Sequence, residues 1–312
     1  MKRIIRIFLI IIIIALLAIT GHLLHLKTLA PKETYPDDTW LASGSNKTAL
    51  IIVAHDDDMI GSSGTISMLC NSGWQIREMC FYQQGGLYAQ KDSLKNPIRK
   101  KDLQAAATLQ GIKSISAIDF NFRYNMDTKE AYMPMPYSAF SSSFMVDSLA
   151  GYIARYIEQY KPSVIFTLDD VMGGYGNPDH VLISRIILDY CNAHKNDPGF
   201  TVRRIYQPVF PKDLAENVLG PMPVYQQAKK VYQAAGMPAP DVQINISAYG
   251  SLKKKAMQTF SSEQNSIRKI WPYYNWYPAW IYFRIFDRDF FRVIRVGEER
   301  LGGRGVPGVP EV

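Results

Sequence analysis

The chain has 312 residues, of which 47% are hydrophobic and 20% are charged, so a disordered chain is excluded and one large or two small globular domains are expected. Of the formal net charge of +7, Lys2, Arg3 and Arg6 contribute three ahead of the first apolar run, and the remaining 7 − 3 = +4 is spread out, which does not favour nucleic-acid binding. The three cysteines show no metal-ligand spacing, and an odd number cannot complete a disulfide framework within one chain.

The segment from Ile7 to Leu26 is apolar and carries no formal charge, with basic residues on both sides. About 20 apolar residues are needed to cross a bilayer, whereas a cleavable signal usually has a shorter apolar region followed by small residues. We therefore expect residues 1–27 to form an uncleaved membrane anchor. The alternative is a cleaved signal, which would export a soluble protein. Because basic residues stay cytoplasmic, everything after Lys27 is expected to face the periplasm or the cell exterior.

Residues 28–46 mix proline, glycine, serine and charge without a period, which predicts a linker rather than a regular element. The main domain is expected over 47–301. Its first part alternates short apolar runs with helical patterns, and such alternation is typical of an α/β, Rossmann-like fold with a mostly parallel sheet flanked by helices. The expected strands are 48–54, 77–83, 114–120 and 163–168, and the expected helices are 59–72, 98–109, 146–157 and 179–194.

The pattern is less regular in the last third of the chain. Strands are expected over 201–206 and 241–247, and a helix over 252–268. The Gly- and Pro-rich residues 302–312 predict a disordered tail.

The stretch 270–291 is half aromatic and is interrupted by two prolines, which favours a packed or interfacial cap over one regular helix. Its tryptophans, Trp271, Trp276 and Trp280, suit three environments: the protein core, a sugar-stacking surface or a membrane interface.

Two polar loops that follow apolar strands carry the candidate chemistry. The sequence AHDDDM, which contains His55, Asp57 and Asp58, follows the first expected strand, and GGYGNPDH, which ends at His180, follows the strand at 163–168. In open α/β sheets ligands bind at the carboxyl ends of the strands, so the two loops can converge there into a metal site. Taken alone, each loop also fits a solvated helix cap or a structural histidine. His194, close to an expected helix end, is interpreted as a surface residue.

These loops resemble motifs of the PIG-L or LmbE-like zinc N-deacetylases. The family pattern A-H-P-D-D-E appears here with Asp56 for the proline and Met59 for the glutamate, and the pattern G-G-Y-G-H-P-D-H of the subgroup similar to mycothiol-pathway deacetylases appears as GGYGNPDH. Arg99-x-x-Asp102-Leu103 resembles the family's R-x-x-E-L helix. The resemblance spans residues 48 to 195.

The resemblance implies that His55, Asp58 and His180 bind Zn²⁺, or another divalent metal such as Fe²⁺, and that Asp57 is the general base. Tyr175 matches the family's tyrosine and is expected to donate a hydrogen bond to the oxyanion. Bound zinc lowers the pKa of its water toward about 7, which makes hydrolysis of an amide feasible at neutral pH.

Other positions of the two motifs carry weaker expectations. Asn177 stands where the family usually has a histidine, and asparagine donates a hydrogen bond but is no acid near neutral pH. Asp179 is expected either to orient an imidazole or to cap the following helix. Arg99 is expected to bind substrate, and Asp56 to be a loop or cap residue. The family's late H-x-S-Q pattern is replaced by FSSEQ over 260–264.

The sequence therefore predicts a metal-dependent amidase that removes an N-acyl group, expected to be N-acetyl, from an amino sugar or glycoconjugate. An outward-facing domain favours a cell-envelope or lipid-linked glycan as the substrate. One alternative, motivated by Asn177, is a catalytically impaired metal- and carbohydrate-binding envelope protein. The other is a phosphotransfer hydrolase of the haloacid dehalogenase type, because Asp56-x-Asp58 follows an apolar strand, although Ile60 stands where that family has Thr or Val.

Overall fold

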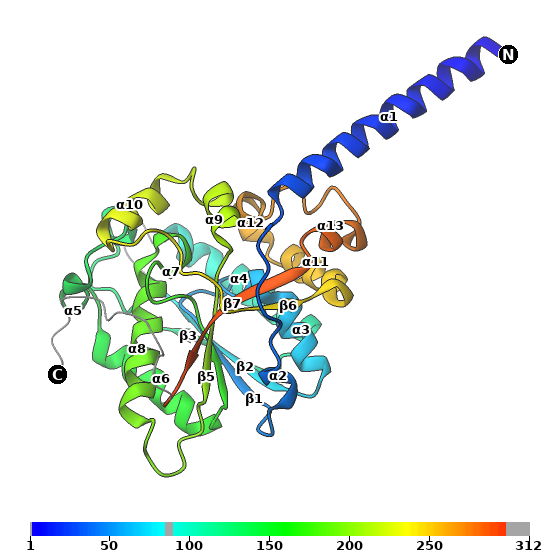
Figure 1. The fold of residues 1–312 in the computed structure, drawn as a ribbon. Coiled ribbons are helices and arrows are strands. Elements are labelled where there is room, and N and C mark those ends of the chain that lie inside the picture. The colour runs from blue at the N-terminus through cyan, green and yellow to red at the C-terminus, as the bar shows by residue number, and fades with distance from the viewer. Residues whose placement is uncertain (1, 85–89, 298–312) are drawn as a thin grey trace.

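The computed structural model describes residues 2–84 and 90–297, so the expected tail at 302–312 lies outside the described residues. Within them, seven strands form one sheet in the order β3-β2-β1-β4-β5-β7-β6 (Figure 1). The first five strands in this order are parallel, and β7 pairs antiparallel with both β5 and β6. The expected α/β fold with a mostly parallel sheet is confirmed. The strands are β1 Thr48–Ile52, β2 Gln75–Tyr82, β3 Ser114–Asp119, β4 Val164–Phe166, β5 Arg204–Pro208, β6 Val242–Asn245 and β7 Arg288–Arg295.

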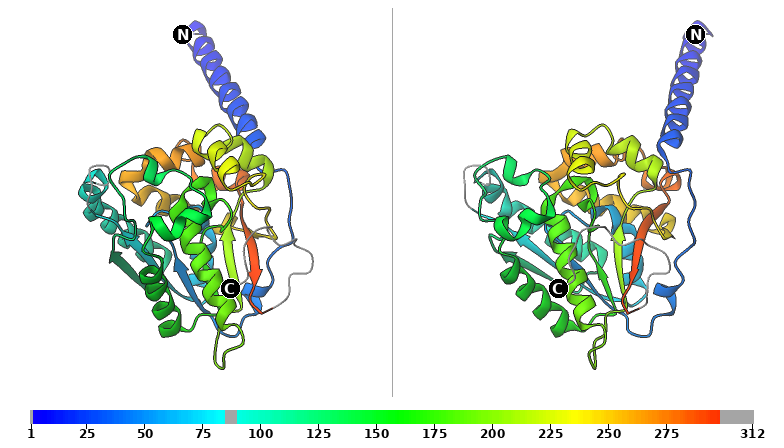
Figure 2. Two further views of the ribbon diagram at one scale, coloured as in Figure 1. Left: turned by 90° about the vertical axis from the view of Figure 1, so that its left-hand side faces the viewer. Right: turned by 60° about the vertical axis from the view of Figure 1, so that its left-hand side comes forward.

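Helices cover both faces of the sheet, as the two views of Figure 2 show. Apolar side chains form one core on each face, and β1 contributes to both: Ala49 and Ile51 lie in one core, and Leu50 and Ile52 in the other. A strand buried on both faces is apolar throughout, which explains its continuous apolar sequence. The first core includes α3 Ser63–Asn71, α4 Gln90–Gln110, α11 Gly250–Thr259, α12 Gln264–Ile270 and α13 Ala279–Ile285; the second includes α5 Phe140–Ser143, α6 Val146–Tyr160, α8 Pro178–His194 and α10 Pro223–Val231.

Of the remaining helices, three contribute one buried side chain each to the first core, Leu26, Leu41 and Leu214, and the fourth is a single turn. They are α1 Lys2–Leu29, α2 Trp40–Ser43, α7 Gly173–Gly176 and α9 Lys212–Val218, with single 3-10 turns at Ile60–Ser62, Glu130–Tyr132, Tyr137–Ala139, Ser247–Tyr249 and Ser261–Glu263.

The sequence predicts one helix over 252–268, whereas the structure has two, α11 and α12, separated by the 3-10 turn Ser261–Glu263. The Asp102 carboxylate of α4 accepts hydrogen bonds from the backbone N–H of Ser261 at 2.7 Å and from its hydroxyl at 2.9 Å. This contact with a distant helix fixes the break, and a local pattern does not reveal it.

The C-terminal strand β7 was not expected. Its first residues, 288–291, belong to the stretch that the sequence assigns to a cap, and only the part that includes α13 packs as one. Strand β7 lies between β5 and β6, both distant in sequence, and pairs such as Tyr206 with Val293 form only when the chain returns to the sheet.

The expected linker over 28–46 is also partly structured. Residues Trp40–Ser43 form α2, Asp37 pairs with Gln243 beside β6, and the Leu41 side chain is buried. The prediction of a stretch without regular elements is therefore wrong for this part. The chain between α1 and β1 follows the edge of the sheet at β6.

Candidate active site

The loop that follows β1 is held by hydrogen bonds of its own. The His55 backbone N–H donates to Asp58 Oδ2 at 2.8 Å, and the Ile60 N–H donates to the Asp57 carbonyl at 3.1 Å. Because one carboxylate oxygen of Asp58 is engaged by the backbone, the other oxygen, Oδ1, is directed toward the imidazoles.

The second loop, between β4 and α8, brings His180 to the same edge of the sheet. Asn177 is the N-cap of α8, and its Oδ1 accepts the Asp179 N–H at 3.0 Å. Gly173 has φ +57°, and a Cβ at this position would lie 2.8 Å from the Cβ of His180. The glycine-rich sequence is therefore required for the close approach of this loop to the histidine.

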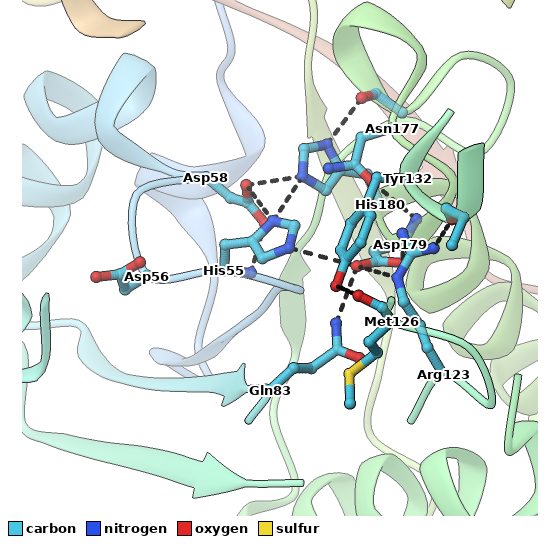
Figure 3. Close-up of polar contacts among 12 residues, drawn as sticks. His55, Asp56, Asp58, Gln83, Arg123, Met126, Tyr132, Asn177, Asp179 and His180 are labelled. Atoms are coloured by element: carbon cyan, nitrogen blue, oxygen red, sulfur yellow. Dashed lines mark hydrogen bonds and ion pairs between the residues drawn. The ribbon is translucent and has the colours of Figure 1, made fainter. Parts of the chain in front are cut away.

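Three donor atoms converge where the two loops meet (Figure 3). His180 Nε2 lies 2.9 Å from His55 Nδ1 and 2.9 Å from Asp58 Oδ1, and His55 Nδ1 lies 3.5 Å from Asp58 Oδ1. Among the described residues these three form a group able to hold one metal ion. Two imidazoles and one carboxylate that leave room for water are the kind of ligand set found at catalytic zinc sites.

In each imidazole, the ring nitrogen that points away from the cluster has a hydrogen-bond acceptor of its own, which leaves the other ring nitrogen free to bind a cation. His180 Nδ1 lies 2.8 Å from the Gly173 carbonyl, which can only accept, so this nitrogen carries the proton and Nε2 presents a lone pair. His55 Nε2 lies 3.4 Å from the Asp179 carboxylate. Metal-bound histidines typically donate their second N–H to a carboxylate or a carbonyl, as both rings do here. The donor set therefore fits zinc.

The electrostatics of the cluster also favour a cation. Burial alone would lower the pKa of His55, but the carboxylates of Asp58 and Asp179 raise it to about 10. Burial would raise the pKa of Asp58, yet the two imidazoles hold it well below its usual range. The site therefore binds positive charge strongly, as a proton or as a metal ion.

Asp57 and Arg99 lie next to this cluster. The Asp57 side chain lines the cavity, and burial raises its pKa to about 6 although the Arg99 guanidinium 3.1 Å away opposes the increase. Arg99 also binds Asp56, whose Oδ1 accepts its Nε–H at 2.8 Å. Asp56 lies in the loop after β1, as expected, but it is 3% exposed and is the buried partner of Arg99.

A cavity of about 440 Å³ opens over the metal ligands and Asp57. Tyr175 and Asn177 line it, and the Tyr175 ring packs edge-on against His180 with centroids 5.6 Å apart. Burial raises the pKa of Tyr175, so its hydroxyl stays protonated and is a hydrogen-bond donor. The predicted site residues are thus brought together around one cavity, whereas His194 is distant and pairs with Asp197 at the end of α8.

Two supporting residues were missed by the sequence analysis. Arg123, 3% exposed, forms an ion pair with Asp179, and Gln83 donates from Nε2 to Asp179 Oδ2 at 3.2 Å. Asp179 in turn faces His55. The successive contacts from Arg123 to Asp179 and from Asp179 to His55 therefore fix the orientation of the His55 ring. Both residues lie outside the two motifs, and no pattern in the sequence indicates that they contact the residues around His55.

Comparison with known proteins agrees with this geometry. Residues 50–191 match the family described as PIG-L, GlcNAc-PI de-N-acetylase. This range includes both loops of the site.

Two curated relatives are 1D-myo-inositol 2-acetamido-2-deoxy-α-D-glucopyranoside deacetylases. The protein from Thermobifida fusca is 24% identical over 70% of this chain and 84% of its own length, and the one from Streptomyces griseus is 24% identical over 84% and 85%. The fold is similar to that of the N,N'-diacetylchitobiose deacetylase from Pyrococcus horikoshii, with a TM-score of 0.50 and 18% identity over 80% of this chain and 85% of that one.

Proposed function

We propose that the chain is a zinc-dependent hydrolase that removes an N-acetyl group from an amino sugar or glycoconjugate, because residues 50–191 match the PIG-L family of de-N-acetylases. The observation that carries the proposal is the convergence of His55, Asp58 and His180 at the floor of a cavity that Asp57 also lines. The two curated relatives are named for a substrate with an acetamido sugar, which supports the same bond type here.

The catalytic roles follow from the position and charge of each side chain. Bound zinc supplies Lewis acidity and a water of lowered pKa, about 7. The Asp57 carboxylate, with its pKa raised to about 6, is ionised at neutral pH and accepts the proton of the attacking water. The same carboxyl group then returns the proton to the departing amine nitrogen. The Tyr175 hydroxyl donates to the oxygen that gains charge when the carbonyl is attacked.

Asn177 limits which groups of the site can protonate the leaving amine. Its Oδ1 is occupied as the cap of α8, which leaves the amide N–H groups as the only ones that can face a substrate. Since an amide is no acid, protonation of the leaving amine falls to Asp57 alone. We therefore expect an active enzyme in which one carboxyl group, that of Asp57, is both general base and general acid, and not the catalytically impaired binding protein of the alternative.

The N-terminal helix supports attachment to a membrane. In α1 an 18-residue window has mean hydropathy 2.9 and is not buried by the rest of the chain. Leu26 near its end is fully buried in the core of the catalytic domain, and cleavage of a signal after this point would remove a core side chain. An uncleaved anchor with the domain facing the periplasm or the exterior is therefore part of the proposal.

The cavity favours a substrate with an apolar portion. From the metal ligands it extends to Pro31, directly after α1, along an apolar wall that includes Phe210, Leu214 and Trp271. An envelope glycan linked to a hydrophobic group fits this shape, with the acetamido group at the metal ligands.

Acetate release from a panel of N-acetylated amino sugars and glycoconjugates tests the function. The zinc-loaded protein should release acetate, and Asp57→Asn should abolish release while zinc content stays at the wild-type level. The matched control is Asp197→Asn, which alters an exposed carboxyl group at the end of α8. Glycan binding without acetate release, unaffected by Asp57→Asn, would replace the enzyme by the binding-protein alternative.

A further inference from the structure

The aromatic stretch 270–286 splits into a buried and an exposed part. The side chains of Trp271 and Tyr274 are 5% and 0% exposed and belong to the core, whereas Trp276 and Trp280 are 71% and 70% exposed. Large exposed aromatic side chains indicate an interaction surface. We refer to Trp276, Trp280 and the exposed basic residues Arg268, Lys269 and Arg284 as the aromatic face.

This face lies at the base of α1, next to α12 and α13 in Figure 1. His22 of α1 stacks on Trp276 with ring centroids 5.4 Å apart, and its Nδ1 lies 2.6 Å from the Tyr277 hydroxyl. Tyr273 packs edge-on against His22 at 4.6 Å. The buried Leu26, one turn further, attaches the same end of α1 to the domain. The helix and the aromatic face are therefore parts of one packed unit.

The length of α1 sets the depth at which the face lies. The part that projects freely runs from Lys2 to Gly21, and at about 1.5 Å per residue it spans about 30 Å. Its three basic residues all lie within six residues of the far end, where long basic side chains reach the headgroups. The hydrocarbon core of a bilayer is about 30 Å thick. When this part crosses the membrane, His22 and the Trp276 ring stacked on it lie at the boundary between lipid and water, where tryptophan is preferred.

The charge of the segment agrees with that location. The residues from Gln264 to Ile285 include Arg268, Lys269 and Arg284 and no acidic residue. Anionic lipid headgroups attract such basic residues, and the attraction adds to the insertion of apolar rings.

We propose that the aromatic face is a second membrane contact, which inserts Trp276 and Trp280 into the outer boundary of the bilayer and fixes the orientation of the catalytic domain. The inference depends on the proposed anchoring by α1 and goes beyond it, because a single span alone would not fix the tilt of the helix and of the domain packed on it. Lys269, Ile270 and Pro31 line the cavity, so this contact holds the cavity mouth at the lipid surface.

Tryptophan fluorescence of the full chain in vesicles of phosphatidylcholine and phosphatidylglycerol tests the proposal. Lipids brominated near the headgroup should quench the wild-type protein, and Trp276→Phe/Trp280→Phe should lose this quenching. The matched control is Trp40→Phe in α2: Trp40 contacts Arg204 at the opposite end of the sheet from α1 (Figure 1), and its removal should leave the quenching unchanged.

The outcomes separate this inference from the proposed anchoring. Protein that leaves the vesicles in alkaline carbonate would refute the anchor. Protein that stays in the membrane but is quenched equally in the wild type and the double variant would refute the aromatic face alone. If soluble chitooligosaccharides, and not brominated lipids, changed the emission of Trp276 and Trp280, the face would be a sugar-binding surface and the proposal would be wrong.

Discussion

At the residue scale, the site depends on three ligands that come from two loops. Each imidazole has a separate hydrogen-bond acceptor for its second nitrogen, Asp179 for His55 and Gly173 for His180, so ring orientation is set before a metal binds. This arrangement distinguishes the cluster from two histidines that only pack together.

Loss of one imidazole should therefore abolish metal retention. His55→Ala and His180→Ala each leave two ligands, and both proteins should lose zinc during gel filtration, measured by plasma mass spectrometry. His194→Ala removes an exposed histidine that pairs with Asp197 and should keep the wild-type zinc content. Zinc at wild-type stoichiometry in both ligand variants would contradict the assigned metal site.

The ligands could be predicted from sequence because they lie in two compact motifs at strand ends. Their support could not, since Arg123 approaches Asp179 only after a long connection folds back to the sheet. The same holds for Asp56: its position in an acidic run suggests a solvated loop, and only the folded structure places Arg99 against it. The proximity of Arg99 to both Asp56 and Asp57 leaves its role in substrate binding a prediction.

Ionisation of the Glu78 side chain in β2 is unfavourable in the folded protein. Its side chain is 3% exposed, and burial, together with the carboxylates of Asp56 and Asp58, raises its pKa from 4.5 to about 8. A pKa raised in the folded state means that the native protein binds the proton more tightly, so wild-type stability falls as pH rises from 4.5 to about 8. Each unit of difference corresponds to at most about 1.4 kcal/mol.

Glu78→Gln should remove this dependence. The variant should melt at a higher temperature than the wild type at pH 8.5, by a margin that shrinks toward zero near pH 4.5, as measured by circular dichroism. Glu130→Gln, which changes an exposed carboxyl group, should show no such trend. A margin that grows as the pH is lowered would show that Glu78 is stabilised as an anion instead.

At the element scale, the last strand supports the first of the two site loops. Asp289 of β7 accepts hydrogen bonds from the N–H and hydroxyl of Thr65 in α3, at 2.9 and 2.8 Å, and pairs with Lys253 of α11 at 2.5 Å. Lys253, fully buried, also donates to the Gly61 carbonyl in the turn after the His55 loop. Three elements and the catalytic loop therefore share one buried ion pair.

Breaking this pair should be costly. Lys253→Met leaves the Asp289 charge buried without its partner, which typically costs about 3–5 kcal/mol. The double variant Lys253→Met/Asp289→Asn removes both charges and should recover much of this loss in urea denaturation. Lys255→Met, on the exposed side of the same helix, should stay within about 0.5 kcal/mol of the wild type. Equal losses in the single and double variants would assign the effect to packing.

The first part of the fold was predictable because each strand and helix there has its own local period. The late elements were not, for two physical reasons. The break between α11 and α12 is imposed by Asp102, and β7 acquires its strand conformation from β5 and β6, which flank it. The aromatic residues before β7 indicated packing correctly, but they gave no indication of the strand that follows them.

At the scale of the whole molecule, the packing of α1 decides whether anchor and enzyme are one unit. The helix projects from the domain in both views of Figure 2, yet its last turns enter the core through Leu26, which is 0% exposed and packs in the same core as residues of α11, α12 and α13. A tethered domain on a flexible linker would have no such contact.

Leu26→Ala should therefore destabilise the catalytic domain, although residue 26 belongs to the N-terminal helix. Truncation of a buried leucine leaves a cavity and typically costs about 2–5 kcal/mol, which should appear as a lower midpoint of thermal unfolding in detergent. Leu24→Ala removes the same atoms from a side chain on the same helix that is 59% exposed, and it should leave the midpoint unchanged. If both variants unfolded like the wild type, α1 would be a tether and not part of the domain. The orientation argued for the aromatic face would then lose its rigid attachment to the helix.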